Sequence, residues 1–210
     1  MKTSAIVFSL LSGAFGAALD SRNYISYCKS YVDTYDDIPA STLLPTLTPV
    51  NIYNGLDYGG FLAAQPIVGT AGIVPKSLPN NAVATLSQDI LELGSLSLNP
   101  FGTIAAASGT KSFNLVSFYF GCLLSSKTGA ADLSEGCTVA VTGYYTNGQQ
   151  APEVTFAFAP TSPNAAPLNL ATLPSTYTGL KNVTFGIANA AVQQQDTDFV
   201  VDNLVHCNYS

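Results

Sequence analysis

Several short stretches of the chain alternate apolar and polar residues with a period of two. Residues 138–142, 154–159 and 182–187 each place Val, Ile or Phe at every second position, with small or polar residues between them. In a β-strand alternate side chains point to opposite faces, so each stretch predicts a strand with one buried face. The dipeptide Asn147-Gly148 lies between the first two stretches and indicates a hairpin turn.

A stretch that is apolar on both faces, 113–121, predicts a central strand. Helical spacing occurs once, over 83–93, and that stretch fits a pair of strands equally well. After residue 23 the chain shows no shift in composition, internal repeat or low-complexity tract. The sequence therefore predicts an all-β fold, a single β-sandwich or jelly roll of about eight to ten strands that spans residues 19–210.

The first residues, 1–18, have the order of an export signal. Lys2 is followed by the apolar stretch 5–11 and then by Gly-Ala-Ala at 16–18, which a signal peptidase accepts. We expect cleavage after Ala18. No later run approaches the roughly 18 apolar residues that a membrane-spanning helix needs. The mature protein is therefore predicted to be secreted and extracellular, with no membrane span.

Charged residues are scarce, at 10% of the chain, and the formal net charge is −6. The 7 Lys and Arg residues are too few to neutralise a nucleic acid, whose duplex carries one charge per about 1.7 Å of its axis. The composition therefore argues against nucleic acid as a partner, and against attachment to an anionic membrane surface.

Four cysteines in an oxidising compartment can pair in three ways. We favour the nested pairing, in which Cys122 and Cys137 close a loop rich in Ser and Gly, and Cys28 and Cys207 join the two ends of the domain. A metal site at the cysteines is disfavoured because the chain has 1 His and no Cys-x-x-Cys motif.

Two N-glycosylation sequons begin at Asn182 and Asn208. If Val183 points into the core, the alternation of its strand turns Asn182 and Thr184 toward solvent. The sequence therefore predicts a glycoprotein, provided that the secreting cell is eukaryotic.

The motifs of several enzyme classes are absent from the sequence. It contains no Gly-x-Ser-x-Gly elbow, no phosphate loop and no Gly-x-Gly-x-x-Gly fingerprint. Its one histidine, His206, lies beside a half-cystine in the predicted last strand, where we expect solvent exposure rather than a catalytic role. No catalytic residue is predicted, and an enzyme would have to be a polysaccharide hydrolase or lyase with paired carboxylates.

Acidic residues gather near both ends of the predicted domain. Counted inward from Cys28 and Cys207, Asp33 and Asp202 are each five residues away, and Asp37 and Asp198 are each nine away. Plain antiparallel pairing would set these carboxylates opposite one another, which is destabilising unless a hard cation compensates. The four residues are therefore a candidate structural calcium site, unless the register slips and each Asp is separately solvated.

Five segments, 35–39, 53–61, 113–121, 139–144 and 199–204, read YDDIP, YNGLDYGGF, FNLVSFYFG, VAVTGY and FVVDNL. In this order they resemble small secreted fungal proteins with a jelly-roll domain of the galactose-binding type, an architecture that many carbohydrate-binding modules share. The resemblance covers about 31–207. It implies the fold, and it implies a calcium near the Asp of the last strand, here Asp202.

The function predicted from these features is a secreted, non-catalytic β-sandwich that binds glycan or cell-wall material. The alternative is a secreted effector that acts on a host or surface protein, and an enzyme of polysaccharides comes third. The chain has no Trp, so any stacking on sugar rings would fall to Tyr or Phe. The candidate ligand-binding residues are Tyr53, Tyr58, Tyr144 and Tyr177.

Overall fold

The structure is a computed structural model, and it describes residues 27–40, 48–66, 72–84, 102–124, 133–190 and 197–210. The described part contains strands and turns and no helix. The strands are β1 (Lys29–Asp33), β2 (Thr48–Tyr53), β3 (Leu56–Ala64), β4 (Ile73–Val74), β5 (Asn81–Ala84), β6 (Gly102–Ala106), β7 (Ser112–Leu124), β8 (Cys137–Tyr145), β9 (Val154–Phe158), β10 (Ala166–Pro167), β11 (Asn169–Thr172), β12 (Leu180–Ala190) and β13 (Thr197–Tyr209).

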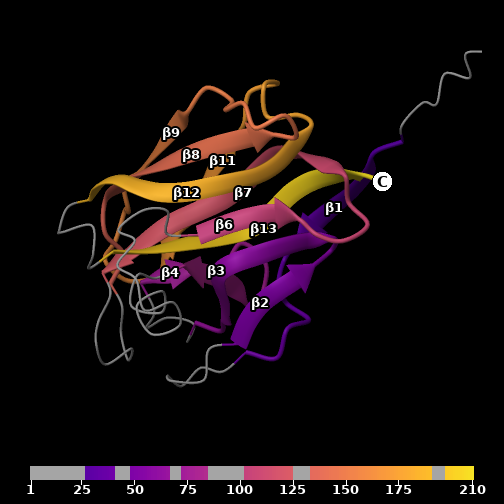
Figure 1. Ribbon diagram of the computed structural model, residues 1–210. Helices are drawn as coiled ribbons and strands as arrows, with labels where there is room; N and C mark the ends of the chain where they lie inside the picture. Colours follow the sequence, from indigo (N-terminus) through magenta and orange to yellow (C-terminus); the bar gives the residue numbers. More distant parts are fainter. Residues whose placement is uncertain (1–26, 41–47, 67–71, 85–101, 125–132, 191–196) are drawn as a thin grey trace, which may run out of the picture.

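Eleven of these strands form one sheet that closes on itself. Its closed ring runs β7-β13-β5-β3-β6-β12 and returns to β7 through the pairing of Leu180 with Phe113. Strands β1, β2, β8, β9 and β11 extend the sheet beyond the ring, so that β2 lies at one side of the molecule and β8 and β9 at the other (Figure 1). The all-β prediction is confirmed, and among the described strands the edges are β1, β2, β9 and β11, each with one neighbour in this sheet.

The predicted strands recur as β8, β9 and β12, with their apolar faces inward as the alternation required. Val183, Phe185 and Ile187 are all fully buried. The hairpin at Asn147-Gly148 joins β8 to β9, and Gly148 adopts the positive φ of 82° that such turns demand. The described part holds more strands than predicted, because two-residue strands such as β4 and β10 are too short to show a period.

The predicted central strand is β7, which pairs with β11, β12 and β13. It is not buried on both faces in the way a strand between two layers would be, because Val116 is 45% exposed on the outer side. Its inward side chain Phe118 contacts the rings of Phe185 and Phe199, and both of these also contact Phe61, inside the ring of strands. This aromatic cluster is the centre of the core.

Both cysteine pairs of the nested prediction lie at disulfide distance. Cys28 bonds Cys207 with a Cα separation of 5.4 Å, and Cys122 bonds Cys137 with a Cα separation of 6.2 Å. The first pair ties the start of β1 to β13, and the two strands are antiparallel neighbours as predicted. The second pair ties β7 to β8, which do not pair directly in the sheet.

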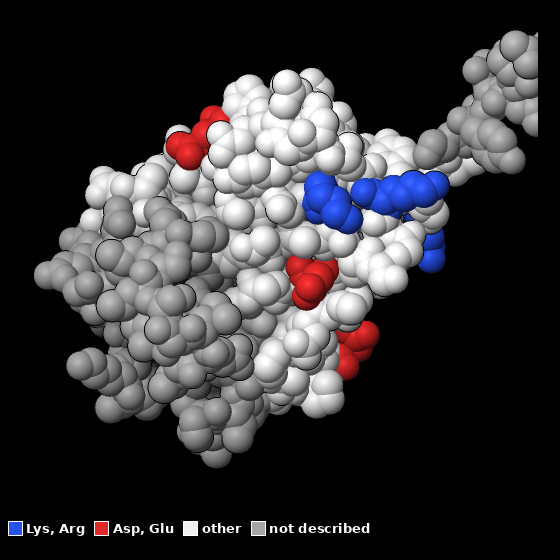
Figure 2. Space-filling model, viewed as in Figure 1, with Lys and Arg blue, Asp and Glu red and all other residues white. Residues whose placement is uncertain are grey.

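Charged side chains are sparse on the visible face of the molecule, and the Lys and Arg residues there gather at one end (Figure 2). None of the described residues forms a helix long and apolar enough to cross a membrane. The predicted signal peptide 1–18 and most of the stretch 83–93 lie outside the described residues, although Val83 belongs to β5. The extent of the single domain stays a prediction.

Candidate functional site

Two of the four candidate ligand tyrosines belong to the core. Tyr58 is 2% exposed and Tyr177 is fully buried. The Tyr177 hydroxyl lies 2.6 Å from the carbonyl oxygen of Val141 and 3.1 Å from that of Pro152, so its polar group has hydrogen-bond partners inside the protein. The prediction that these two rings face a ligand is wrong, because each ring has enough apolar surface to reward burial once its hydroxyl has a partner.

The other two, Tyr53 and Tyr144, are partly exposed but lie far apart in the sheet. Tyr53 is in β2 and Tyr144 is in β8, with β3, β6 and β12 between them. Tyr145, the neighbour of Tyr144, is partly buried and packs against the core. The structure therefore does not bring the predicted tyrosine platform together.

The structure also separates the four candidate calcium ligands. In the register of β1 and β13, Asp33 lies opposite Leu204 rather than Asp202. Asp37 accepts a hydrogen bond from the Tyr53 hydroxyl at 2.5 Å, and Asp198 is buried at the far end of β13, opposite Leu123. Among the described residues no three acidic, His or Cys side chains are grouped to hold a metal. The facing carboxylates that motivated the calcium site are absent, and calcium binding stays a prediction.

Asp202 instead binds the backbone of the segment that contains Lys76 and Ser77. Its Oδ2 accepts hydrogen bonds from the backbone N–H groups of Lys76 (2.7 Å) and Ser77 (2.9 Å), and its Oδ1 accepts one from the N–H of Asn203 (2.7 Å). Asn203 has a positive φ of 45°, and the β7–β13 register shifts between Asp202 and Val205. Burial raises the pKa of Asp202 to about 6, although the three N–H donors act in the opposite direction.

We expect Asp202 to make the protein more stable in mild acid. Its folded pKa lies above the ordinary value of 3.8, so its contribution is fully present below about pH 4 and is lost as pH rises through 6. The free energy of unfolding of wild type, relative to that of Asp202→Asn, should therefore increase as the pH falls from 7 to 4. The slope of this difference against pH should correspond to the uptake of at most about one proton. Urea unfolding at four pH values measures it. The control is the exposed Asp57→Asn, measured at the same four pH values.

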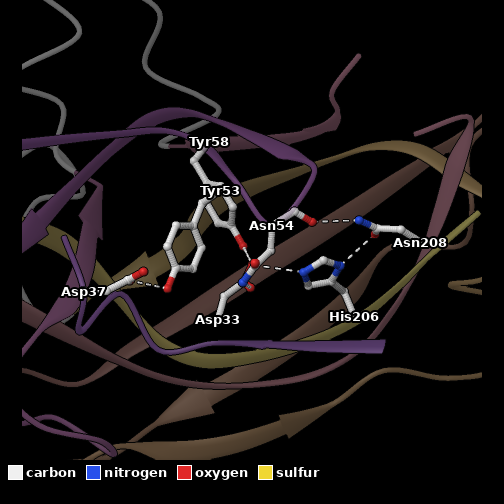
Figure 3. A network of polar contacts seen from close by, with 7 residues as sticks. All are labelled: Asp33, Asp37, Tyr53, Asn54, Tyr58, His206 and Asn208. Carbon is white, nitrogen blue, oxygen red and sulfur yellow. Dashed lines mark hydrogen bonds and ion pairs between the residues drawn. The ribbon is translucent and has the colours of Figure 1, made fainter. Parts of the chain in front are cut away.

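A buried polar network holds the end of β13 against β1 and the β2–β3 hairpin (Figure 3). Asp33 and His206 are both fully buried, with His206 Nε2 3.0 Å from Asp33 Oδ2, close as an ion pair but not aligned as a hydrogen bond. Tyr58 donates its hydroxyl proton to the same oxygen, and Asn54 Nδ2 donates to Asp33 Oδ1 at 2.7 Å. Burial raises the pKa of Tyr58 well above its ordinary value, which keeps the hydroxyl a donor. The prediction that His206 is exposed to solvent is wrong.

The second nitrogen of His206 continues the network. Its Nδ1 lies 2.8 Å from Asn208 Oδ1, and Asn208 Nδ2 donates to the carbonyl oxygen of Asn54 at 2.8 Å. Tyr31 stacks on the imidazole with ring centroids 5.2 Å apart. A glycan on Asn208 would have to remove its amide from this buried position, so the network argues against modification of Asn208 in the folded protein. Asn182 is half-buried in β12, between β6 and β8.

No substrate can reach the Asp33–His206 pair, because both side chains are inaccessible. The pair has the residue types of a catalytic dyad but serves to fix three segments that are distant in sequence. Sequence reasoning missed it because an Asp and a His 173 positions apart, the difference between 206 and 33, meet only through the β1–β13 register.

An open pocket lies on the outer side of the same strand end. It has a volume of about 490 Å³ and is lined by Lys111, Ser112, Asn114, Thr178, Gly179, Tyr209 and Ser210. The lining follows from the register, since Tyr209 lies opposite Ser112 and Cys207 lies opposite Asn114. The side chains of Cys207 and Tyr209 point outward because His206 and Asn208, which alternate with them along β13, point into the core.

Asn114 fixes the shape of this pocket. Its Nδ2 donates to the Tyr209 hydroxyl at 3.0 Å, and its Oδ1 accepts from the backbone N–H of Gly179 at 2.8 Å. One amide therefore holds both the aromatic ring and the loop that forms the opposite wall. The pocket offers hydroxyl, amide and ammonium groups beside one half-buried ring, a combination that suits a polyhydroxylated ligand.

Sequence reasoning did not select Tyr209. The signal was present in the alternation of the last strand, which sets Cys207 and Tyr209 on one face and His206 and Asn208 on the other. The sequence did not show where residues 178–179 lie. The turn before β12 places them against β7.

Of the comparisons with known proteins, the one with solved structures found similar folds. No family model matches the sequence, and no curated protein matches it. A DUF4465 family protein from Bacteroides caccae superimposes with a TM-score of 0.49 at 10% identity, over 85% of this chain and 98% of that one.

Two further solved structures are similar at lower scores. A carbohydrate-binding module of family 29 has a TM-score of 0.32 at 10% identity and covers 86% of this chain and 88% of its own. The CBM22-1 and GH10 modules of a Clostridium thermocellum xylanase 10B, in complex with xylohexaose, have a TM-score of 0.33 at 10% identity over 87% of this chain and 29% of that chain. Likeness at this level does not define a family or a ligand, so function has to be argued from the pocket.

Proposed function

We propose that this protein is a secreted, non-catalytic β-domain of jelly-roll type that binds glycan through the pocket beside Tyr209. The observation that carries the proposal is the pocket itself, in which Asn114 holds the Tyr209 hydroxyl while Ser112 and Thr178 add hydroxyl groups around it. Sugars are recognised by such a combination, since hydroxyl and amide groups pair with sugar hydroxyls and an aromatic ring desolvates the apolar face of a pyranose.

The buried network supports this proposal through rigidity. His206 and Asn208 are held from inside, and the pocket residue Tyr209 directly follows Asn208 on the same strand. A binding strand whose inner face cannot shift presents its outer side chains in one arrangement, which lowers the entropy cost of binding.

Replacing Tyr209 by Ala should weaken glycan binding by about tenfold, which corresponds to about 1.4 kcal/mol. Tyr209→Phe should keep most of the affinity, because the ring remains and only the hydrogen bond from Asn114 is lost. Affinity electrophoresis in chitin, β-glucan, mannan and pectin measures the effect.

Tyr144→Ala is the matched control, since Tyr144 is also partly exposed but lies in β8, away from the pocket lining. It should leave binding unchanged. Binding by wild type that survives in Tyr209→Ala but disappears in Tyr144→Ala would move the site to β8. Absence of binding to every polysaccharide would favour the alternative of an effector acting on a host or surface protein.

A further inference from the structure

Cationic side chains collect beside the pocket although the protein as a whole is acidic. In the described ranges the basic residues other than His206 are Lys29, Lys76, Lys111 and Lys181. Three of these stand at the ends of adjoining strands. Lys29 begins β1, Lys111 directly precedes β7, and Lys181 follows the first residue of β12.

The sheet register places these three strand ends together. Lys29 pairs with Asn208 of β13, Asn208 pairs with Phe113 of β7, and Phe113 pairs with Leu180 of β12. The row therefore crosses four strands at the level of the pocket, and it agrees with the gathering of Lys and Arg at one end of the visible face in Figure 2. All three lysines are exposed.

Lys111 belongs to the pocket lining itself. Its backbone N–H donates to the carbonyl oxygen of Tyr209 at 2.8 Å, which fixes where its side chain starts. The lining contains no Asp or Glu. Lys29 is at the same end of the sheet but on its other face, because it pairs with the inward Asn208 and its Nζ lies 4.8 Å from the centre of the Tyr31 ring. Asp33, the acidic residue of β1, faces inward to His206.

We propose that the pocket selects an acidic saccharide, with its carboxylate or sulfate group bound by Lys111 and attracted by Lys181. This inference rests on the proposed glycan binding and adds the charge of the ligand. A neutral glycan can accept an ordinary hydrogen bond from the ammonium group, whereas an anionic group forms a stronger, charge-assisted one. A chain with a net charge of −6 repels anions in general, so an acidic polymer would be oriented toward the one end where cations gather.

Polymers of phosphate are a poor fit for the same surface. Three lysines on one end cannot follow a duplex that carries a charge about every 1.7 Å. A saccharide with one anionic group per sugar, by contrast, needs one cation for each sugar unit bound, and its rings can stack on Tyr209.

The test is calorimetry with a matched pair of ligands, a tetramer of galacturonate and the same tetramer with its carboxyl groups reduced to alcohols. We expect the acidic tetramer to bind roughly tenfold or more tightly, as a charge-assisted hydrogen bond would give. Its affinity should fall between about 50 and 200 mM salt as the charges are screened. A sulfated oligosaccharide of equal length identifies which anionic group is preferred.

Lys111→Gln should lose about tenfold in affinity for the acidic tetramer and nothing for the neutral one. Lys76→Gln is the control, because Lys76 is also exposed but lies over the ring of Tyr119, outside the pocket lining. It should leave both affinities unchanged. Neither substitution removes a backbone contact, so thermal midpoints should stay close to that of wild type.

Equal affinity for the acidic and neutral tetramers would overturn the charge selectivity while leaving glycan binding intact. Failure of both the galacturonate and the sulfated ligand, with neutral polysaccharides still bound in electrophoresis, would have the same meaning. A polyglutamate peptide that binds as tightly as the acidic tetramer, with the same dependence on Lys111, would show that the site recognises anionic charge without sugar. Loss of all binding would overturn this inference and the proposed function together.

Discussion

Replacing Asp33 by Ala should lower the free energy of unfolding by about 3–5 kcal/mol, a large part of the total for a domain of this size. The carboxylate is the shared acceptor for the Tyr58 hydroxyl and the Asn54 amide, and it is the partner of His206. Its removal leaves two buried groups, the Tyr58 hydroxyl and the His206 ring, without that partner, and burial of unpaired polar groups is costly. Urea unfolding followed by circular dichroism measures the loss.

Asp37→Ala is the matched control for this prediction. Asp37 also accepts a hydrogen bond from a tyrosine, Tyr53, but its side chain is exposed, so its loss should cost about 1 kcal/mol or less. Asp33→Asn keeps an acceptor for Tyr58 and should fall between the two. If Asp33→Ala cost no more than Asp37→Ala, the network would not be what holds β13 against the hairpin.

Removal of the Cys28–Cys207 bond should cost more stability than removal of Cys122–Cys137. The two bonds close loops that differ in sequence separation, 179 residues against 15. On the chain-entropy model the long loop contributes about 5 kcal/mol and the short one about 3 kcal/mol. The double variant Cys28→Ala with Cys207→Ala should therefore have the lower urea midpoint of the two double variants.

Native-state hydrogen exchange separates this entropy effect from local damage. Loss of the long bond should raise exchange over β1, which among the described strands pairs with β13 alone. Loss of the short bond should raise it instead near the junction of β7 and β8. Equal losses from both double variants would contradict the loop-length argument.

The all-β class and several individual strands follow from the sequence because their signal is local. The period of two in 182–187 sets Val183, Phe185 and Ile187 on one face regardless of which strands lie beside them, and all three are buried. The hairpin at Asn147-Gly148 is equally local, since the turn requires a residue such as glycine at positive φ. The cysteine pairs were also within reach, because four cysteines allow only three pairings.

Register was beyond what the sequence determined. The symmetric count from Cys28 and Cys207 set Asp33 against Asp202, but the structure pairs Asp33 with Leu204. The β1–β13 ladder sets Ser30, not the bonded Cys28, opposite Cys207, and such a shift by two residues keeps every side chain on its face. The inward and outward pattern predicted from the sequence is therefore compatible with either pairing. Only the tertiary structure shows which pairing forms.

The sequence by itself determined which residues are able to point inward, and the tertiary structure decided what each of them meets there. His206 occupies an inward position on β13 in either reading, but its burial depends on Asp33, Tyr58 and Asn208 arriving from other segments to satisfy its ring and one another. Tyr209 is outward by alternation, but a pocket exists beside it only because Asn114 draws the 178–179 loop onto β7. Alternation is a property of neighbouring residues, whereas a polar network and a pocket wall require contacts between strands far apart in the chain.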